Sequence, residues 1–274
     1  MILDGFEPLQ MSEEEYRGDP AVNKSTLWEM RRSPAHYMYA LTHPREDTAA
    51  FKLGRAAHMA ILQPVEFREH YVLEPVADKR TKEGKQIWAD FMAQMRDGQE
   101  IISEQDYWDV MGMYDSVYMD VNASAWLDGA ITEVPLFWTD ESTGIQCKCR
   151  LDAMTERDGQ IILMDLKTCA DASTGTFLRE ALRYGYDVQA AHYIRGVKNE
   201  FPDAHVQWYF ICVEKKAPYA VNVIHVSEDF IDRGTLQLIG LMDKLKTCTT
   251  TGEWPGYGFN ELVLPPWAEI PEDE

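Results

Sequence analysis

Three short apolar segments joined by turn-forming residues place the strongest constraint on the fold of this chain. The segments span residues 131–138, 145–154 and 161–168 and are rich in β-branched, aromatic and other apolar residues. The connections at 141–144 and 157–159 contain Gly, Ser, Thr or Asp. Because connections this short join antiparallel neighbours, the sequence predicts a β-meander.

Acidic residues occur on each strand of this predicted meander. Glu133, Asp152 and Asp165 lie on successive strands, and carboxylates crowded together repel one another unless a cation or proton intervenes. Asp165 and Lys167 are two positions apart and share a strand face, whereas Leu166 points the other way. Carboxylates suit Mg²⁺ or Mn²⁺, and an adjacent ammonium can orient or deprotonate a water and neutralise charge on phosphorus. An Asp-Leu-Lys triplet alone is also typical of a solvated strand face.

Two predicted helices add polar residues to this set. Gln189 and Tyr193 are four apart within a helix predicted over residues 176–201, so they share a helix face. His58 lies in a helix that opens at Leu53 and contains small residues, which permit close packing. A tyrosine at this spacing is also typical of a core, and a single histidine is usually a packing or surface residue. Near acidic residues, an imidazole is instead a candidate metal ligand.

The remaining pattern indicates an α/β (α+β) protein with a helical N-terminal part. Strands are predicted over 206–213 and 219–226, and a helix with one apolar face over 228–247. The 274 residues show no low-complexity linker, so we expect one domain over 1–274. The Pro-, Gly- and Trp-rich end is expected to be extended and to pack over the core or a neighbour, and acidic residues 269–274 are expected to fray.

The net charge of -20 argues against a protein that grips nucleic acid over its whole surface. Binding depends, however, on where the positive groups lie. Local clusters supply candidate DNA contacts: Arg31, Arg32, Arg55, Lys79, Arg80, Lys82, Lys85, Lys148 and Arg150. Residues 79–85 are predicted to form a loop, which either closes on DNA or is an ordinary solvated loop. Lys148 and Arg150 alternate with Asp152, so the strand face with the metal site is expected to meet the DNA backbone.

Ser25 is a candidate phosphate contact at the start of a helix predicted over 26–32. Helix N-terminal amides bind phosphate readily. Serine is also a favoured N-cap residue, and the N-cap role is the preferred interpretation here.

These residues resemble the motif series of one nuclease family. The elements Leu-Gly-x-x-x-His58, Glu133, Asp152, Asp165-x-Lys167 and Gln189-x-x-x-Tyr193 occur in the order typical of the RecB-like branch of the PD-(D/E)XK nucleases. Further segments resemble the RecE-type phage recombination exonucleases within that branch, at 11–16, 22–27, 33–37, 62–67, 79–85, 144–150, 253–255 and 264–268. The second acid is Asp rather than Glu, and Leu151 replaces the proline that gives the family its name.

The resemblance implies a restriction-endonuclease-like core, with a central mixed sheet flanked by helices, and a Mg²⁺-dependent exonuclease. Such an enzyme degrades one strand of linear double-stranded DNA from the 5′ end and leaves a 3′ single strand for recombination. Carried over by position, Asp152, Asp165 and the Leu166 carbonyl bind the metal together with His58, and Lys167 activates the water. Glu133, Gln189 and Tyr193 position water, lysine or phosphate. The alternatives are another RecB-like nuclease, either an endonuclease or one of opposite polarity, and a catalytically silent DNA-binding module.

Some members of this branch hold an iron-sulfur cluster with one upstream cysteine and three near the C-terminus. The five cysteines here, Cys147, Cys149, Cys169, Cys212 and Cys248, do not follow that arrangement, so no cluster is expected. Cys147 and Cys149 are expected to be buried small apolar residues. An odd cysteine count without a secretory signal is typical of a reducing cytosol.

The resemblance also implies partners. They are double-stranded DNA ends, a single-strand annealing protein of the RecT type, and further copies of the chain in a closed ring, with a tetramer favoured over a trimer. No apolar stretch approaches the ~20 residues of a membrane span, so no membrane partner is expected. The expected location is the cytoplasm of a bacterial host, with a phage or prophage origin.

Overall fold

A five-stranded mixed sheet forms the centre of the computed structural model, which describes residues 2–43 and 47–265. Its strands lie in the order β3-β4-β5-β6-β7, and every neighbouring pair is antiparallel except β5 and β6. The strands are β3 (Ile131–Thr139), β4 (Gln146–Arg157), β5 (Gln160–Cys169), β6 (Val206–Glu214) and β7 (Val221–His225). The predicted meander is therefore β3-β4-β5, and both additional strands are confirmed.

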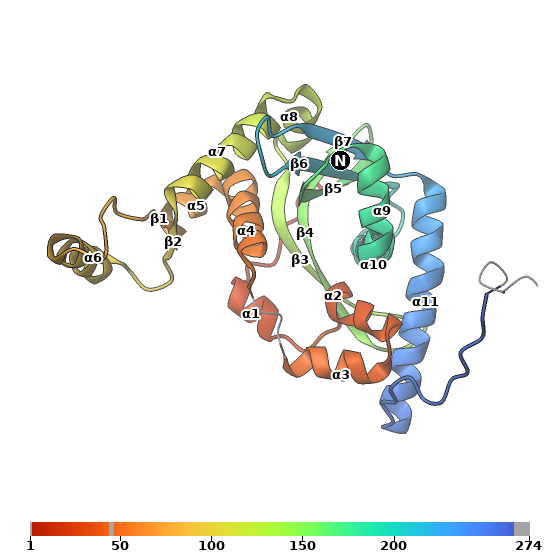
Figure 1. The fold of residues 1–274 in the computed structure, drawn as a ribbon. Helices are drawn as coiled ribbons and strands as arrows, with labels where there is room; N and C mark the ends of the chain where they lie inside the picture. The colour runs from red at the N-terminus through yellow and green to blue at the C-terminus, as the bar shows by residue number, and fades with distance from the viewer. Residues whose placement is uncertain (1, 44–46, 266–274) are drawn as a thin grey trace, which may run out of the picture.

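Helices pack on both faces of this sheet and form a three-layered arrangement (Figure 1). The helices are α1 (Glu13–Gly18), α2 (Lys24–Leu27), η1 (Trp28–Arg31), α3 (Pro34–Thr42), α4 (Ala49–Leu62), α5 (Pro64–His70), α6 (Lys82–Gln94), α7 (Glu104–Met119), α8 (Val121–Leu127), α9 (Thr174–Tyr184), α10 (Tyr186–Glu200) and α11 (Glu228–Thr251). In the part of the chain that is described, no helix has the length and apolar character needed to cross a membrane.

The sheet separates two apolar cores. On one face, Leu163, Phe210 and neighbouring strand residues pack against α10 and α11. On the other, Ile162 and Met164 pack with residues of α4 and α7. Alternate residues of β5 thus enter opposite cores, as the strand period of two requires. All five cysteines are buried thiols, as expected for Cys147 and Cys149.

The pairing of β4 with its neighbours is interrupted at Asp152. Thr132 pairs with Ala153 and Val134 with Leu151, but the intervening Glu133 and Asp152 do not pair. Leu151 enters the core beside α10, whereas Ala153, two residues further on, enters the core beside α4. Residues two apart on a regular strand share a face, so the backbone changes its facing at Asp152.

The helix predicted over 176–201 is two helices. Gly185 ends α9 in the left-handed conformation, with φ of 67°, and α10 starts at the next residue. A side chain at this position would also meet the Trp28 ring at 2.7 Å. Glycine adopts positive φ without steric penalty. The helical hydrophobic periodicity continues from α9 into α10, so Gly185 was the only sequence signal of the bend between them.

Four other predicted boundaries were wrong. The helix predicted over 26–32 starts at Lys24 and continues as the 3₁₀ turn η1 from Trp28. The stretch predicted as a loop over 79–85 enters α6 at Lys82, with Thr81 as its N-cap. The helix expected from Leu53 begins at Ala49, and the late helix extends to Thr251.

An arm formed by residues 71–102 projects from the body. It contains β1 (Tyr71–Leu73), α6 and β2 (Glu100–Ile102), and its two strands pair in parallel. Figure 1 shows α6 at the far left, well separated from the central sheet. The chain leaves α11 at the opposite side as an extended segment. The acidic residues 269–274 lie outside the described part of the chain.

Candidate active site

The interrupted ladder turns the Asp152 carboxylate toward β5. Its Oδ2 accepts a hydrogen bond of 2.8 Å from the backbone N–H of Leu166. The regular pairing of β4 with β5 ends at Ala153 and Met164. Beyond that point the Asp152 carboxylate, rather than a backbone carbonyl of β4, accepts the hydrogen bond from the Leu166 N–H. The N–H and C=O of one strand residue point to the same edge. The Leu166 carbonyl therefore faces the Asp152 side, as the predicted ligand role requires.

Glu133 occupies the matching irregularity on β3. Its φ is 55°, which is uncommon for a residue with a side chain. Strained backbone of this kind often marks a functional site. The Glu133 Oε2 lies 2.7 Å from Arg150 Nε, and both side chains are mostly buried. Glu133 is thus held at the sheet surface by a cation on the adjacent strand.

His58 reaches the same place from α4. Its Nδ1 lies 3.7 Å from Asp152 Oδ2. The helix approaches β5 closely at Gly54, where an added Cβ would lie 3.3 Å from Thr168 Oγ1. One ligand atom each from His58, Glu133 and Asp152 lies within 4.8 Å of the others. Three residues far apart in sequence are thereby brought together, as predicted.

Asp165 and Lys167 form a second group next to this cluster. Their carboxylate and ammonium are in direct contact. Gln189 of α10 joins the pair, because its Nε2 donates to Asp165 Oδ1 at 2.5 Å and its Oε1 accepts from Lys167 Nζ at 3.4 Å. The Lys167 ammonium also lies 4.5 Å from the centre of the Tyr186 ring. The Asp165–Lys167 pair is therefore held by two residues of α10, Gln189 and Tyr186.

The charges of this centre perturb one another. Burial raises the pKa of Glu133 to about 7, and the Asp152 carboxylate adds to the increase while Arg150 opposes it. Burial also raises the pKa of Asp165 to about 6, although the adjacent Lys167 acts in the opposite direction. For Lys167, burial lowers the pKa, but Asp165, Tyr186 and Asp152 outweigh it and the pKa rises. Lys167 is therefore held as an ammonium among partly protonated acids.

This donor set fits a hard divalent cation. Asp165 Oδ2 is buried and accepts no hydrogen bond of good geometry, although the Lys167 ammonium lies beside it. His58, Glu133 and Asp152 supply one nitrogen and carboxylate oxygens within reach of a single ion. Carboxylate oxygens suit Mg²⁺ or Mn²⁺. A cation there would offset both the burial and the repulsion from Asp152 that raise the pKa values of Glu133 and Asp165.

Tyr193 lies beside this centre rather than within its hydrogen bonds. Its ring contacts Trp208 edge to face, with centroids 5.7 Å apart. Burial raises the pKa of the Tyr193 phenol well above its usual value, and nearby negative groups including Asp165 and Asp152 contribute. Its predicted role in positioning water or phosphate remains a prediction.

Lys148 does not meet the surface, contrary to expectation. It is 2 % exposed, and its Nζ donates to the carbonyls of Tyr16 and Asp19, the latter at 2.7 Å. Lys148 and Arg150 share a strand face, but α1 and the residues after it cover that face at Lys148, and the strand changes its facing at Asp152. Arg150 remains partly exposed and contacts Glu13 of α1 as well as Glu133.

Ser25 is not an N-cap. Asn23 caps α2, with its side chain accepting from Thr26 N, and Ser25 lies exposed within the helix. Arg31 stacks its guanidinium 4.5 Å from the centre of the Trp28 ring, and Arg32 lies 3.6 Å from Glu29. None of these three residues contacts the acidic cluster in the described part of the chain.

Arg55 and the basic residues of the arm are also separate from the cluster. Arg55 contacts Asp47 at 2.6 Å and Glu100 at 3.7 Å. The others lie at the start of α6 on the projecting arm (Figure 1): Lys79, Arg80, Lys82 and Lys85. Lys79 lies over the Trp88 ring, and Arg80 pairs with Asp78 at 2.9 Å. The predicted DNA contacts are thus divided between distant surfaces.

Two residues that the sequence interpretation missed belong to the centre. Tyr186 supports Lys167 through its ring, and its position three residues before Gln189 on one helix face was a usable signal. Glu13 binds Arg150 from α1. Nothing local to the sequence around Glu13 indicates that contact, because it joins segments far apart in the chain.

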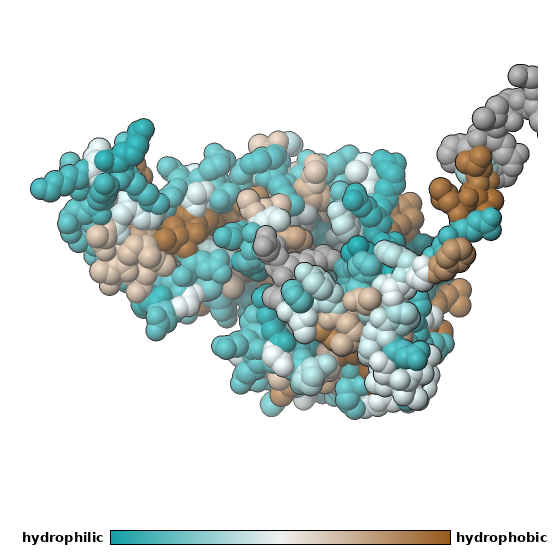
Figure 2. Space-filling model, turned by 60° about the horizontal axis from the view of Figure 1, so that its bottom comes forward, coloured by the Kyte–Doolittle hydropathy of each residue, from teal (hydrophilic) through white to brown (hydrophobic). Residues whose placement is uncertain are grey.

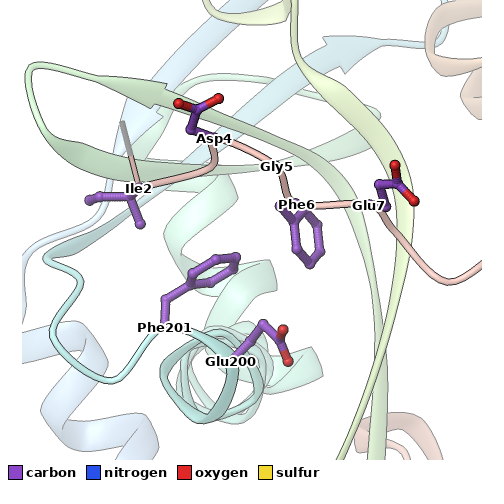
Figure 3. Close-up of a pocket in the computed structure, with 7 residues that line it drawn as sticks. All are labelled: Ile2, Asp4, Gly5, Phe6, Glu7, Glu200 and Phe201. Carbon is purple, nitrogen blue, oxygen red and sulfur yellow. The ribbon is translucent and has the colours of Figure 1, made fainter.

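A cavity of about 450 Å³ lies elsewhere, between the N-terminal segment and the end of α10. Figure 3 shows the Phe6 and Phe201 rings next to each other there, in edge-to-face contact with centroids 5.2 Å apart. Its lining consists of Ile2, Asp4, Gly5, Phe6, Glu7, Glu200 and Phe201. None of the predicted site residues lines it, so it is unrelated to the acidic centre.

Comparison with known families agrees with the geometry of this centre. Residues 23–262 match the family described as a PDDEXK-like domain of unknown function (DUF3799). The chain belongs to this family. Membership places it in the PD-(D/E)XK superfamily and confirms both the superfamily and the core fold predicted from the motifs. The narrower resemblance to RecE-type exonucleases stays a prediction.

One solved structure shares the fold of this PDDEXK-like domain. The crystal structure of a candidate exonuclease from Eubacterium rectale aligns over 94% of this chain and 96% of its own, with a TM-score of 0.59 and 14% identity. At that identity the likeness shows the fold alone. A second structure, of SSO0001, covers 79% of this chain and 85% of its own at 13% identity, but its TM-score of 0.28 carries no argument. No curated protein matches the chain significantly.

Proposed function

We propose that the protein is a Mg²⁺-dependent exonuclease that hydrolyses linear double-stranded DNA from the 5′ end and leaves 3′ single strands for recombination by strand annealing. One observation supports nuclease chemistry most strongly. At the break in the β3-β4-β5 ladder, His58, Glu133 and Asp152 lie next to Asp165 and Lys167. The polarity, the annealing partner and the ring assembly rest on the sequence resemblance.

In this proposal His58, Asp152, Asp165 and the Leu166 carbonyl hold the metal ion, with Glu133 beside them. A bound divalent ion supplies Lewis acidity and lowers the pKa of a coordinated water. Lys167, kept as an ammonium by Asp165, donates hydrogen bonds that orient the attacking water and neutralise charge on the phosphate. Because its pKa is raised rather than lowered, orientation is favoured over proton abstraction.

Gln189, Tyr186 and Arg150 are proposed as positioning residues. Gln189 bridges Asp165 and Lys167 through both ends of its amide and so fixes their separation. Tyr186 supports the ammonium from the other side. Arg150 orients Glu133 and has a guanidinium edge available to a phosphate once Glu13 is displaced.

Digestion of linear duplex DNA labelled at either the 5′ or the 3′ end tests this function. With Mg²⁺, we expect label to be released first from the 5′ end, and no digestion when the metal is chelated. Covalently closed circles should remain intact. Early release from the 3′ end would overturn the polarity, and efficient cutting of circles would identify an endonuclease instead.

A further inference from the structure

The C-terminal segment carries apolar side chains that its own molecule does not cover. It is fixed to the body near its start, where Trp254 stacks on Tyr37 with ring centroids 5.7 Å apart. Tyr257 also contacts the His36 ring, with centroids 5.5 Å apart, and remains 66% exposed. Beyond Tyr257 the chain extends outward, and Phe259 is 100% exposed and Leu262 98% exposed. The exposed apolar residues of the segment are Tyr257, Phe259, Leu262, Val263 and Leu264. Figure 2 shows brown residues along this projection at the right.

The apolar area of this segment is comparable to one half of a protein interface. An aromatic side chain offers roughly 150–250 Å², so the five together offer on the order of 700 Å². A standard interface buries about 800 Å² on each partner. Exposed apolar area of this size within one short segment is uncommon on a free surface, which favours a partner that covers it.

The arm presents a surface of matching character. Apolar residues are exposed near and along α6, with Val76 92%, Ile87 41% and Met92 53% exposed. Three lysines border them at the start of the helix, Lys79, Lys82 and Lys85, whereas Arg80 is paired with Asp78. The surface is therefore apolar with a positive edge, within a chain of net charge -20.

The C-terminal segment has the complementary charge. Residues 253–274 contain no Lys or Arg, and the sequence after the apolar residues ends in Glu269, Glu272, Asp273 and Glu274. The C-terminal segment, apolar residues followed by acidic ones, is thus complementary to the arm surface, which is apolar and bordered by lysines. Such complementarity favours one orientation of docking over others.

The two surfaces lie at opposite ends of the molecule. Figure 1 shows the arm at the left and the C-terminal segment leaving at the right, and Figure 2 shows the same separation from another direction. We propose that the C-terminal segment of one copy, residues 256–264, docks on the arm of a second copy, over α6 and its basic edge. Because the two surfaces differ, the contact is head-to-tail and can be repeated around a ring.

This contact assigns the arm lysines to a neighbouring subunit rather than to DNA. It depends on exposed surfaces only and not on the nuclease chemistry. Its test therefore needs neither DNA nor metal, and its failure leaves the proposed nuclease chemistry unaffected.

Cysteine cross-linking between separately labelled copies tests the contact. All native cysteines are buried, so an introduced surface thiol reacts selectively. Phe259→Cys copies are mixed with Ile87→Cys copies and treated with a short bifunctional maleimide. We expect a product of twice the 31.5 kDa chain mass in the mixture, and little product from either variant alone. The matched control pairs Phe259→Cys with Leu236→Cys on α11, which is 73% exposed.

Sedimentation velocity of the full chain provides the second readout. We expect wild-type protein to self-associate, and both Leu262→Asp and the pair Lys82→Glu with Lys85→Glu to convert it to monomer. These side chains are exposed, so folding should be retained. A monomeric wild type would overturn the proposal. So would a mixed product no stronger than the control, strong cross-linking by Phe259→Cys alone, or association unaffected by either set of variants.

Discussion

At the residue scale, the contact between Arg150 and Glu13 places a carboxylate on a guanidinium beside the acidic centre. Arginine binds carboxylate and phosphate in similar geometry. Under the proposed function Glu13 therefore occupies the position of a DNA phosphate until substrate arrives. The Arg150 side chain is mostly buried, whereas Glu13 is half exposed and so free to move aside.

We predict that Glu13→Gln binds DNA more tightly than wild type. Removing an exposed competing ion pair should lower KM by about two- to fivefold, which corresponds to ~0.5–1 kcal/mol, with kcat little changed. Steady-state digestion of linear duplex measures both constants. Glu14→Gln is the matched control, because it removes the same charge from an adjacent exposed position. Equal effects of the two substitutions would show a net-charge effect and contradict a specific role for Glu13.

His192, which lies away from the metal cluster, makes a pH-dependent contribution to the free energy of unfolding. It is buried beneath Trp138, and its Nε2 lies 3.1 Å from the Lys148 carbonyl, to which the neutral ring can donate. Burial lowers the pKa of His192 to about 4, although this hydrogen bond opposes the change. Because the folded pKa is below the unfolded value of 6.5, the stabilisation is present above pH 6.5 and is lost as pH falls toward 4.

We therefore expect wild type to lose about 3 kcal/mol from this group between pH 6.5 and pH 4. His192→Gln retains a hydrogen-bond donor but does not titrate, so its free energy of unfolding should fall less over the same range. Urea unfolding at several pH values measures the difference in slope. Parallel pH profiles for the two proteins would show that His192 does not carry this dependence.

At the element scale, the sequence predicted the strands better than the bend between consecutive helices. Alternation and turn residues identified β3, β4 and β5, because each strand and turn is a local pattern. The division between α9 and α10 depended on one residue, Gly185, and on the Trp28 ring packed against it. The burial of Lys148 was not predictable, since alternation fixes a face of the strand but not whether a distant helix covers it.

The same distinction applies to the candidate site. Motif spacing identified Asp152, Asp165 and Lys167 because each lies on a strand with a regular period. The irregular φ of Glu133 and the change of facing at Asp152 have no local signature, because they arise where the pairing between β3 and β4 skips one residue pair and the pairing between β4 and β5 ends. Tyr186 lies three residues before Gln189 on the same helix, so helix periodicity was a sufficient signal for its place beside the site.

Close packing of α10 against α11 predicts opposite effects for two glycines on α11. An added Cβ at Gly234 would lie 2.0 Å from the Asp187 carbonyl oxygen, whereas at Gly240 it would meet nothing within 4 Å. Gly234→Ala should therefore destabilise the fold by about 2 kcal/mol or more, because backbone must move. Gly240→Ala should stabilise it by up to ~1 kcal/mol through helix propensity. Thermal unfolding measures both, and equal shifts would contradict the observed helix packing.

At the scale of the whole molecule, metal binding should couple to folding through the raised carboxyl pKa values. The pKa of Glu133 is about 7 and that of Asp165 about 6, both above the ordinary values of 4.5 and 3.8. A raised folded pKa gives stability that is present below the unfolded value and lost as pH rises through the folded value. Without metal, ionisation of these acids should destabilise the fold between roughly pH 4 and pH 7.

We predict that Mg²⁺ or Mn²⁺ raises Tm more at pH 8 than at pH 5.5. At pH 8 the acids are ionised and free to bind, and a ligand at 100 times its Kd stabilises by about 2.7 kcal/mol. At pH 5.5 the ion must displace protons first. Calorimetry at both pH values checks the expectation, with Asp152→Asn as the variant that should lose the metal effect. A larger metal effect at pH 5.5 would contradict the assigned ligands.

The central claim is that the cluster on β3, β4 and β5 is a metal-dependent nuclease centre. Its most direct test is digestion of linear duplex DNA by wild type, Asp165→Asn and Lys167→Met, with Lys198→Met as a matched control on an exposed part of α10. The account predicts metal-dependent digestion by wild type and by the control, and a fall of about 10²–10⁴-fold in each site variant, with folding retained by circular dichroism. Site variants as active as wild type, or a wild type that binds metal but leaves duplex DNA intact, would contradict it.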